Sequence, residues 1–278
     1  HGYDEEPEDA GAYDLVVVGG GMAGTCAAVR AARNGLKVAF IQDRPVVGGN
    51  NSSEVRVWLH GAKRGPRARN LGNILAEFEQ EERAHYGPEN KAHLYEDDKK
   101  LAVVGAEENI RFFPSHRMNK VETKGSRIQA VIAEQTETGK RLRFTGKLFA
   151  DCTGDGCVGH LAGADFEMTI EEGHMGRCNL WHAEDTKQPQ TFPRCPWALD
   201  LSRKPFPGRN KSPAKGIKEL GGWYWESGFY HDPFEKNEYI RDWNFRAMYG
   251  AWDALKNVDE AYGSYEIGWA AYVSGKRE

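Results

Sequence analysis

Three glycines with the spacing G-x-G-x-x-G constrain this chain more than any other feature. They are Gly19, Gly21 and Gly24, and they follow a short run of apolar residues. A glycine turn between a strand and a helix is typical of dinucleotide-binding folds. The sequence around the turn predicts such a βαβ unit, with a buried strand over 13–18, an Ala-rich helix over 23–34 and a second strand over 36–41.

Each glycine of the turn has its own physical role in such folds. Gly19 permits the tight turn out of the strand, Gly21 lets the backbone approach a pyrophosphate, and Gly24 lets the helix pack closely on the strand. The pyrophosphate then lies at the positive end of the helix. We therefore expect a dinucleotide to contact this turn, at Gly19, Gly21, Met22, Ala23 and Gly24. A purely structural turn is the alternative.

The end of the second strand should carry an acidic residue that holds the ribose hydroxyls of the adenosine. The position where we expect that residue holds Gln42, and Asp43 follows it. A Gln side chain can still hydrogen-bond a hydroxyl group. Both residues are therefore candidates for the cofactor site, although only one of them need serve. The alternative for Asp43 is that it caps the next turn.

A second string rich in glycine and polar residues follows the second strand. Gly48 and Gly49 lack a Cβ, so the backbone can approach a ligand closely there. Asn50, Asn51 and Ser52 offer amide and hydroxyl groups to a phosphate or to the edge of a flavin. We expect all five residues to contact the cofactor. An ordinary loop rich in Asn and Ser is the alternative.

A third string, Asp-Cys-Thr-Gly-Asp-Gly at residues 151–156, also follows a predicted strand. Together the three strings resemble those of the glutathione-reductase-like flavoproteins. Within that group the chain is similar to a family of FAD-dependent oxidoreductases that are often found in carbohydrate-degrading bacteria, and the similarity runs across residues 13–278. The resemblance implies FAD as the cofactor. It implies an α/β fold with a Rossmann-like FAD-binding domain, an inserted antiparallel β-meander and an aromatic-rich substrate domain.

The resemblance also implies roles for residues in the third string and at the end of the chain. The turn at Gly154 should close over the FAD, with Asp155 near its ribityl chain or its pyrophosphate. The alternative for Asp155 is a helix N-cap. In similar proteins the stretch at 275–278 turns back toward the cofactor, which would place Arg277 near the cofactor or an interface. We therefore expect a partner chain, or a second copy of this chain, to complete the fold.

The remaining sequence predicts a tail over residues 1–12, the FAD-binding domain over 13–165 and the substrate domain over 166–278. Residues 1–12 are acidic, whereas Trp, Tyr, Phe and Pro become dense after about residue 166. The first domain should contain an amphipathic helix over 71–86. Its meander should consist of strands over 118–121, 128–135 and 141–149.

Candidates for catalysis must supply a proton donor or acceptor, because a flavin itself carries the redox step. Glu226 is the strongest candidate, since Trp and Tyr residues precede it and suit a sugar face or a flavin ring. His60 follows the second string and is either an acid/base or a hydrogen-bonded structural histidine. His231 is a further candidate.

No metal is expected. His174, Cys178 and His182 recur at every fourth position, but glycines weaken a helix there and no fourth ligand is evident. A redox disulfide between Cys152 and Cys157 is a further alternative. Disulfide-reducing flavoproteins usually carry such a pair on the helix after the second strand, not in the third string.

Composition excludes several classes of protein. The chain has 278 residues, a hydrophobic content of 40% and a formal net charge of -4. Its most basic stretch, Lys63–Arg69, is explained by a solvated loop, so no nucleic-acid partner is expected. No apolar run reaches the ~18 residues that span a bilayer. The acidic start is not a signal peptide, although a signal could have been cleaved, and the compartment stays open.

Taken together, the sequence predicts hydride transfer between a small organic substrate and FAD, with a carbohydrate or polyol favoured. One alternative is an NAD-dependent dehydrogenase that uses the same βαβ unit. The other is a non-catalytic or incomplete FAD-binding subunit of a split enzyme.

Overall fold

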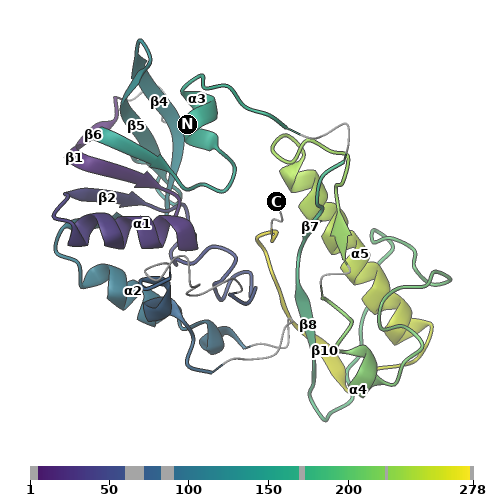
Figure 1. Cartoon of the computed structure of the whole chain (residues 1–278). Helices are drawn as coiled ribbons and strands as arrows, with labels where there is room; N and C mark the ends of the chain where they lie inside the picture. Colours follow the sequence, from purple (N-terminus) through teal and green to yellow (C-terminus); the bar gives the residue numbers. More distant parts are fainter. Residues whose placement is uncertain (1–5, 60–71, 83–90, 169–172, 223–224, 276–278) are drawn as a thin grey trace, which may run out of the picture. The chain divides into compact units, whose positions relative to one another are not determined.

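The computed structural model of the chain describes residues 6–59, 72–82, 91–168, 173–222 and 225–275. These residues form two compact units, which Figure 1 colours by sequence. Unit 1 takes the described residues within His1–Ser52, Leu59–Glu81 and Tyr95–Glu167. Unit 2 takes those within Ser53–Trp58, Glu82–Leu94 and Met168–Glu278.

Unit 1 is built on one six-stranded sheet with the order β3-β2-β1-β6-β5-β4. Its strands are β1 (Glu8–Val18), β2 (Val38–Ile41), β3 (Ile110–Phe113), β4 (His116–Lys124), β5 (Arg127–Gln135) and β6 (Arg141–Asp151). β1 pairs in parallel with β2 and β6, and β2 with β3, whereas β4, β5 and β6 pair antiparallel. The predicted α/β fold is confirmed. The meander continues the parallel sheet and does not form a separate layer.

Both faces of the parallel strands are buried, because neighbouring residues alternate between two apolar clusters. The helices of unit 1 are α1 (Met22–Arg33), α2 (Asp97–Gly105) and α3 (Cys157–Leu161). Val17 and Phe40 pack with residues of α1 and α2 on one face. Val16 and Ile41 pack on the other face, in the cluster that holds Val158 of α3. The βαβ unit predicted from the glycine turn is confirmed as β1-α1-β2.

The predicted tail is wrong in part, because β1 already begins at Glu8. Glu8 pairs with Leu142 of β6 and Asp9 pairs with Arg143. The register shifts between Asp9 and Gly11, where Gly11 takes a φ of 102°. The partner strand thus supplies hydrogen bonds to backbone groups that a solvated tail would leave to water.

The helix predicted over 71–86 is also wrong in the part of that segment that the structure describes. Only a 3₁₀ turn at Leu75–Phe78 is helical there, and the chain is extended at Glu79. Phe78 is fully buried. The Gln80 amide donates a hydrogen bond to a side chain outside the segment. Tertiary contacts have overridden the helical spacing.

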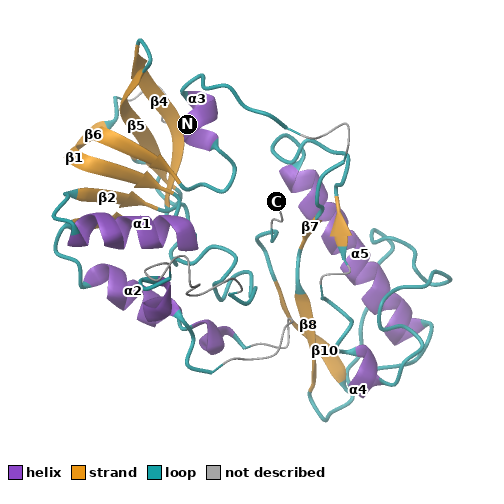
Figure 2. Cartoon of the chain, viewed as in Figure 1, coloured by secondary structure: helices purple, strands orange, loops and turns teal. Residues whose placement is uncertain are grey.

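Unit 2 contains one long helix and many loops (Figure 2). Its elements are β7 (Arg177–Cys178), β8 (Trp181–Asp185), α4 (Pro213–Gly216), β9 (Glu226–Ser227), α5 (Asn237–Asn257) and β10 (Tyr265–Ala270). β8 pairs antiparallel with β10, and β7 pairs antiparallel with β9. A 3₁₀ turn at Ala92–Tyr95 lies at the boundary of the two units in the sequence. With so few strands, the loops must be held by side-chain packing.

Aromatic side chains supply that packing. Trp181 and Trp252 are fully buried, and their rings meet edge to face at 6.1 Å. Trp252 also contacts the rings of Phe192 and Tyr262. Edge-to-face ring pairs stabilise a core beyond the area that they bury. The dense aromatic residues of this region therefore build a core as well as a surface.

α5 spans this core with one buried face. Ile240, Asn244, Met248 and Trp252 are buried at every fourth position. Asn244 is polar, and its amide donates to the Arg177 carbonyl and to the Asn179 side chain, each at 3.0 Å. The helix is thus amphipathic. Among the described residues, no helix is both long and apolar enough to cross a lipid bilayer.

We expect Trp252→Ala to lower the free energy of unfolding of unit 2 by about 3–5 kcal/mol, because it removes a buried ring and leaves a cavity. Urea unfolding followed by far-UV circular dichroism measures this loss. Trp197→Ala is the matched control, since Trp197 is 53% exposed and should cost much less. Equal losses in the two variants would contradict the assignment of Trp252 to the core.

Candidate cofactor site

Three glycine-containing segments of unit 1 meet where β1, β2 and β6 end. We call them together the cofactor edge: Gly19–Gly24, Gly48–Ser52 and Asp151–Gly156. The Gly48 N–H donates to the Gly20 carbonyl at 2.7 Å, and Gly21 forms a parallel bridge with Gly48. The Cys152 N–H donates to the Val18 carbonyl at 2.8 Å. In open α/β sheets, ligands bind outside the carboxyl ends of the strands. The three strings singled out from the sequence thus converge at such an edge.

The glycines of the first segment divide into tight and open positions. A Cβ on Gly24 would overlap the Gly19 carbonyl oxygen, and a Cβ on Gly19, whose φ is 103°, would overlap the Cys152 carbonyl. At Gly21, in contrast, an added Cβ would meet no atom of the described residues within 4 Å. Gly19 and Gly24 are therefore required by the protein's own packing. Gly21 borders open space, which is what the approach of a pyrophosphate requires.

The start of α1 supplies the charge that this space needs. Gly21 is the N-cap residue and, as a glycine, has no side chain to cap the first N–H groups. The first turn, which begins with Met22 and the exposed Ala23, contains no acidic residue. A helix of this length carries partial positive charge at its N-terminus, where it favours an anion. The residues present therefore fit the pyrophosphate of a dinucleotide.

The structure gives different surroundings to the two ribose-binding candidates at the end of β2, Gln42 and Asp43. The Gln42 side chain is buried, accepts a hydrogen bond from the Gly20 N–H at 2.8 Å and donates to the Val46 carbonyl at 3.0 Å. It thereby shapes the glycine turn. The Asp43 carboxylate is 51% exposed. Asp43 is therefore the better placed of the two for a ribose hydroxyl, and that contact stays a prediction.

Buried polar groups hold the second segment. The Ser52 hydroxyl donates to the Gly49 carbonyl at 2.7 Å, and the Asn51 side chain accepts from Gln80 at 2.8 Å. The fully buried Lys100 ammonium donates to the Asn51 carbonyl at 2.5 Å and pairs with Asp97 at 3.3 Å. Burial lowers the pKa of Lys100.

Asn51 and Ser52 thus stabilise the loop, while Asn50 is exposed and Gly49 half-buried. Direct contact of these residues and of Gly48 with the cofactor stays a prediction. Sequence reasoning missed Lys100, because nothing around it marks it as a partner of a loop that lies far earlier in the chain.

Asp151 and Thr153 organise the third segment. The Asp151 carboxylate accepts the N–H groups of Val158 and Gly159 at 2.8 and 3.0 Å. The Thr153 hydroxyl accepts the Cys157 N–H at 3.1 Å. The N-cap position of α3 is Gly156, so the alternative reading of Asp155 as the N-cap residue is wrong.

Asp155 is half-buried beside Gly154, whose φ is 77°. A left-handed backbone of that kind favours glycine. Contact of Gly154 and Asp155 with the cofactor remains a prediction. The role of Asp151 was missed, because it lies five residues before the N-cap position Gly156 and reaches the N–H groups of α3 only through the fold of the turn.

Of the three catalytic candidates, His60 lies outside the described residues. Arg277, a cofactor candidate, lies outside them as well. Glu226 is half-buried in β9, opposite Cys178 of β7. His231 is exposed, and its ring meets Tyr239 edge to face at 5.4 Å. Both residues belong to unit 2.

The contacts of His174 and Cys178 bear on the metal alternative, and the state of the cysteines bears on the disulfide alternative. Both ring nitrogens of His174 lie next to backbone carbonyls, and the Cys178 thiol is buried and donates to the Gly222 carbonyl at 3.5 Å. Across the described ranges, no group of three His, Cys, Asp or Glu side chains is arranged to hold a metal ion. All five cysteines are described and are free thiols. Burial raises the pKa of Cys152, which disfavours a reactive thiolate.

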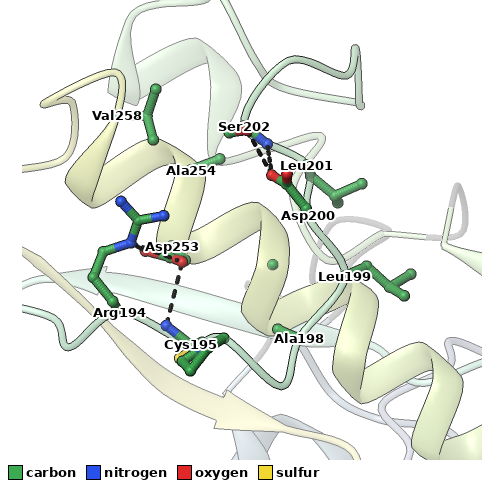
Figure 3. A pocket seen from close by; sticks show the side chains of 12 residues that line it. Arg194, Cys195, Ala198, Leu199, Asp200, Leu201, Ser202, Asp253, Ala254 and Val258 are labelled. Carbon is green, nitrogen blue, oxygen red and sulfur yellow. Dashed lines mark hydrogen bonds and ion pairs between the residues drawn. The ribbon is translucent and has the colours of Figure 1, made fainter.

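Unit 2 also contains a hollow of about 360 Å³ between the loop 194–202 and α5 (Figure 3). Its charged groups are paired with one another. Arg194 pairs with Asp253 at 3.0 Å, and Asp253 also accepts the Cys195 N–H at 3.3 Å. Ser202 donates to Asp200 at 2.5 Å. These contacts give the hollow a structural explanation, and it is a weaker candidate for a ligand site than the cofactor edge.

Comparison with known proteins supports the reading of the cofactor edge. A family model described as "FAD dependent oxidoreductase" matches residues 14–266. Over 38 residues the chain is 58% identical to the soluble pyridine nucleotide transhydrogenase of Ectopseudomonas mendocina (strain ymp), which is 14% of this chain and 8% of that protein. The family match covers all three glycine-containing segments, so FAD is the cofactor of this protein.

Two solved structures show how much of a longer protein the chain matches. One is the 3-ketosteroid-delta4-(5alpha)-dehydrogenase from Rhodococcus jostii RHA1, at 14% identity and a TM-score of 0.38, covering 51% of this chain and 47% of that one. The other is a geranylgeranyl bacteriochlorophyll reductase-like protein from Thermoplasma acidophilum, at 17% identity and a TM-score of 0.40, covering 68% of this chain and 49% of that one. The chain therefore spans about half the length of these structures and 8% of the curated relative.

We expect Gly21→Val to abolish FAD retention while the protein stays folded. The Cβ of the new side chain would enter the open space beside the N-terminus of α1, where no atom of the described residues lies within 4 Å, and the methyl groups would occupy the space that a pyrophosphate needs. Flavin absorbance after gel filtration, together with the far-UV circular dichroism spectrum, measures both properties. Gly24→Val is the control, and it should lose the fold because its Cβ overlaps the Gly19 carbonyl. A folded Gly21→Val protein with a full complement of FAD would show that Gly21 is not at the pyrophosphate.

Proposed function

The chain belongs to the family of FAD dependent oxidoreductases, and from this premise we propose that it transfers a hydride between a small organic substrate and FAD. A carbohydrate or polyol is the substrate class that we favour. The observation that carries the proposal is the convergence of three glycine-containing segments at one edge of the sheet, with open space at Gly21. An edge of this kind is where a nucleotide cofactor binds in open α/β sheets.

In this arrangement the flavin and the protein have separate roles. When bound, the flavin supplies the hydride acceptor or donor, and the protein supplies orientation, electrostatics and proton transfer. The N-terminus of α1 would hold the pyrophosphate, and Asp43 would hold the ribose. Gln42, Lys100 and Asp151 keep the three segments in shape through the hydrogen bonds described above. These residues bind and position the cofactor and leave proton transfer to other groups.

Glu226 is the group that we propose for proton transfer. Gly176 makes room for it, because a Cβ on that glycine would lie 3.0 Å from the Cβ of Glu226. The preceding Trp225 ring packs at 5.8 Å from Trp181, so the backbone at this position is well anchored. A carboxylate on an anchored backbone can take a proton from a hydroxyl group of the substrate, as the oxidation of an alcohol requires. This combination supports a polyol more than an apolar substrate.

The function is tested by identifying the released nucleotide and then by anaerobic titration. Denatured protein should release FAD. The folded protein should lose its flavin absorbance when glucose, another free sugar or a cyclic polyol is added without oxygen. Release of NAD alone would favour the NAD-dependent alternative. FAD that no polyol reduces would contradict the substrate class, and FAD that no small organic substrate reduces would favour a non-catalytic subunit.

We expect Glu226→Gln to slow flavin reduction by roughly 10²–10⁴-fold, the usual effect of losing a general acid or base. The amide keeps the shape of the side chain but cannot accept the proton. Stopped-flow absorbance at saturating substrate measures the rate. Glu235→Gln is the matched control, because Glu235 is an exposed carboxylate of the same unit. Reduction of Glu226→Gln at the wild-type rate would assign Glu226 to structure.

The association predicted from the sequence also remains a proposal, in which a second copy covers exposed aromatic side chains of unit 2. Phe229, Phe234 and Tyr239 are 41%, 47% and 49% exposed. Exposed apolar side chains can drive association where they gather into a patch.

We expect the chain to sediment as an oligomer that dissociates on dilution. The double variant Phe229→Ser/Phe234→Ser should sediment as a monomer at the same concentration, because it removes the apolar surface. A wild-type monomer that retains FAD at high dilution would contradict this proposal.

A further inference from the structure

A second hollow in unit 2, of about 350 Å³, has the composition of a small-molecule site. Small-molecule pockets begin at roughly 300 Å³ and combine apolar walls with a few polar groups. The residues that line it are Ser53, Glu54, Arg56, Ala92, Trp269, Ala270, Tyr272 and Val273. All of them belong to unit 2. The proposed function assigns a role to none of them.

The two sides of the hollow differ in chemistry. One short segment, Ser53–Arg56, supplies a hydroxyl, a carboxylate and a guanidinium. The end of β10 and the residues after it supply two aromatic rings and small apolar groups. Among these, Trp269 is half-buried, whereas Tyr272 is 70% exposed. A polar side therefore meets an aromatic side within one cavity.

Arg56 connects the two sides. Its guanidinium carbon lies 3.7 Å from the centre of the Trp269 ring, a close cation–π contact. Its Nε donates to the Ser53 carbonyl at 3.2 Å. The backbone of Arg56 has a φ of 62°, which is rare for a residue with a long side chain. Such conformations persist where the surroundings impose them, and they gather at ligand sites.

Tyr272 is held in place on its own side. Arg241 of α5 lies over its ring at 5.3 Å and donates to its hydroxyl at 3.4 Å. Ala271, the residue before it, is fully buried, and its N–H donates to the Leu180 carbonyl at 2.6 Å. The ring is therefore exposed but anchored, so a ligand that stacks on it would lose little entropy in ordering it.

We infer that this hollow binds the substrate, as a neutral ring that carries several hydroxyl groups. The inference rests on the proposed function and names the place where its substrate would bind. Glu54 and Arg56 have opposite charges on the same side, so a charged ligand would be attracted by one and repelled by the other. Hydroxyl groups both donate and accept, so they can hydrogen-bond a carboxylate and a guanidinium alike. The C–H face of such a ring then packs on Trp269 or Tyr272.

Continuity along the chain agrees with this assignment. Ser53 follows Ser52 directly, and Ser52 ends the second segment of the cofactor edge. The polar side of the hollow therefore begins one peptide bond after a loop that is assigned to FAD.

Isothermal titration calorimetry of the FAD-loaded protein tests the inference without depending on turnover. The probes are methyl glucoside and myo-inositol as neutral rings and gluconate as an anion. The variants are Tyr272→Ala and Glu54→Gln. Tyr230→Ala is the control, because Tyr230 is 73% exposed and does not line the hollow. We expect a neutral ring to bind, and to bind about tenfold more weakly to each of the two variants but not to the control.

Flavin reduction by the same probes, measured separately, distinguishes the two proposals. If a neutral ring reduces the flavin while Tyr272→Ala and Glu54→Gln bind it as tightly as the wild type, the hollow is not the site and the proposed function stands. If binding weakens in the variants but no probe reduces the flavin, the site stands and the proposed reaction is wrong. Tighter binding of gluconate than of both neutral rings, or binding of none of the three, would overturn the inference.

Discussion

The close approach of α1 to the end of β1 is the contact on which the cofactor edge depends. Gly24 lies so near the Gly19 carbonyl that no side chain fits, and Gly19 in turn lies against Cys152. Because these backbones touch, the first turn of α1 is aimed at the space beside Gly21, and the ends of β1 and β6 are held together. A helix displaced by one methyl group would still be a helix, but its first turn would no longer border the same open space beside Gly21.

Much of this edge could be predicted because its information is local. The spacing of Gly19, Gly21 and Gly24 identifies the turn without reference to any distant residue. The role of Gln42 could not be read in the same way, because its side chain serves Gly20 and Val46 only after β1 and β2 have paired. The long helix α5 was not recognised either, since polar Asn244 interrupts its buried face and bonds to residues that lie far away in the sequence.

Buried polar groups recur wherever a loop of this protein must keep one shape. Lys100 loses its hydration to hold the Asn51 carbonyl, and Asn244 bonds to the backbone of β7. Such groups are costly to bury and costly to leave without partners, so each tolerates few alternative arrangements. Apolar contacts alone would allow a loop to slide. The polar contacts fix a single geometry, and a loop that is ordered before the ligand arrives binds it with a smaller loss of entropy.

β6 is the last strand of the meander and also the parallel neighbour of β1, at the centre of the sheet. During synthesis β1 leaves the ribosome before β6, so the side of Val18 that pairs with Asp151 stays uncovered until β6 has been made. Long-range parallel pairing is slow for this reason, and an uncovered strand can pair with the wrong chain. The edge of β1 that stays unpaired until β6 is made carries two charged residues, Glu8 and Asp9. It also has an irregular register at Gly11. Charges and bulges are the devices that keep an exposed strand from aggregating, so the start of β1 is suited to protecting the nascent chain until β6 has been made.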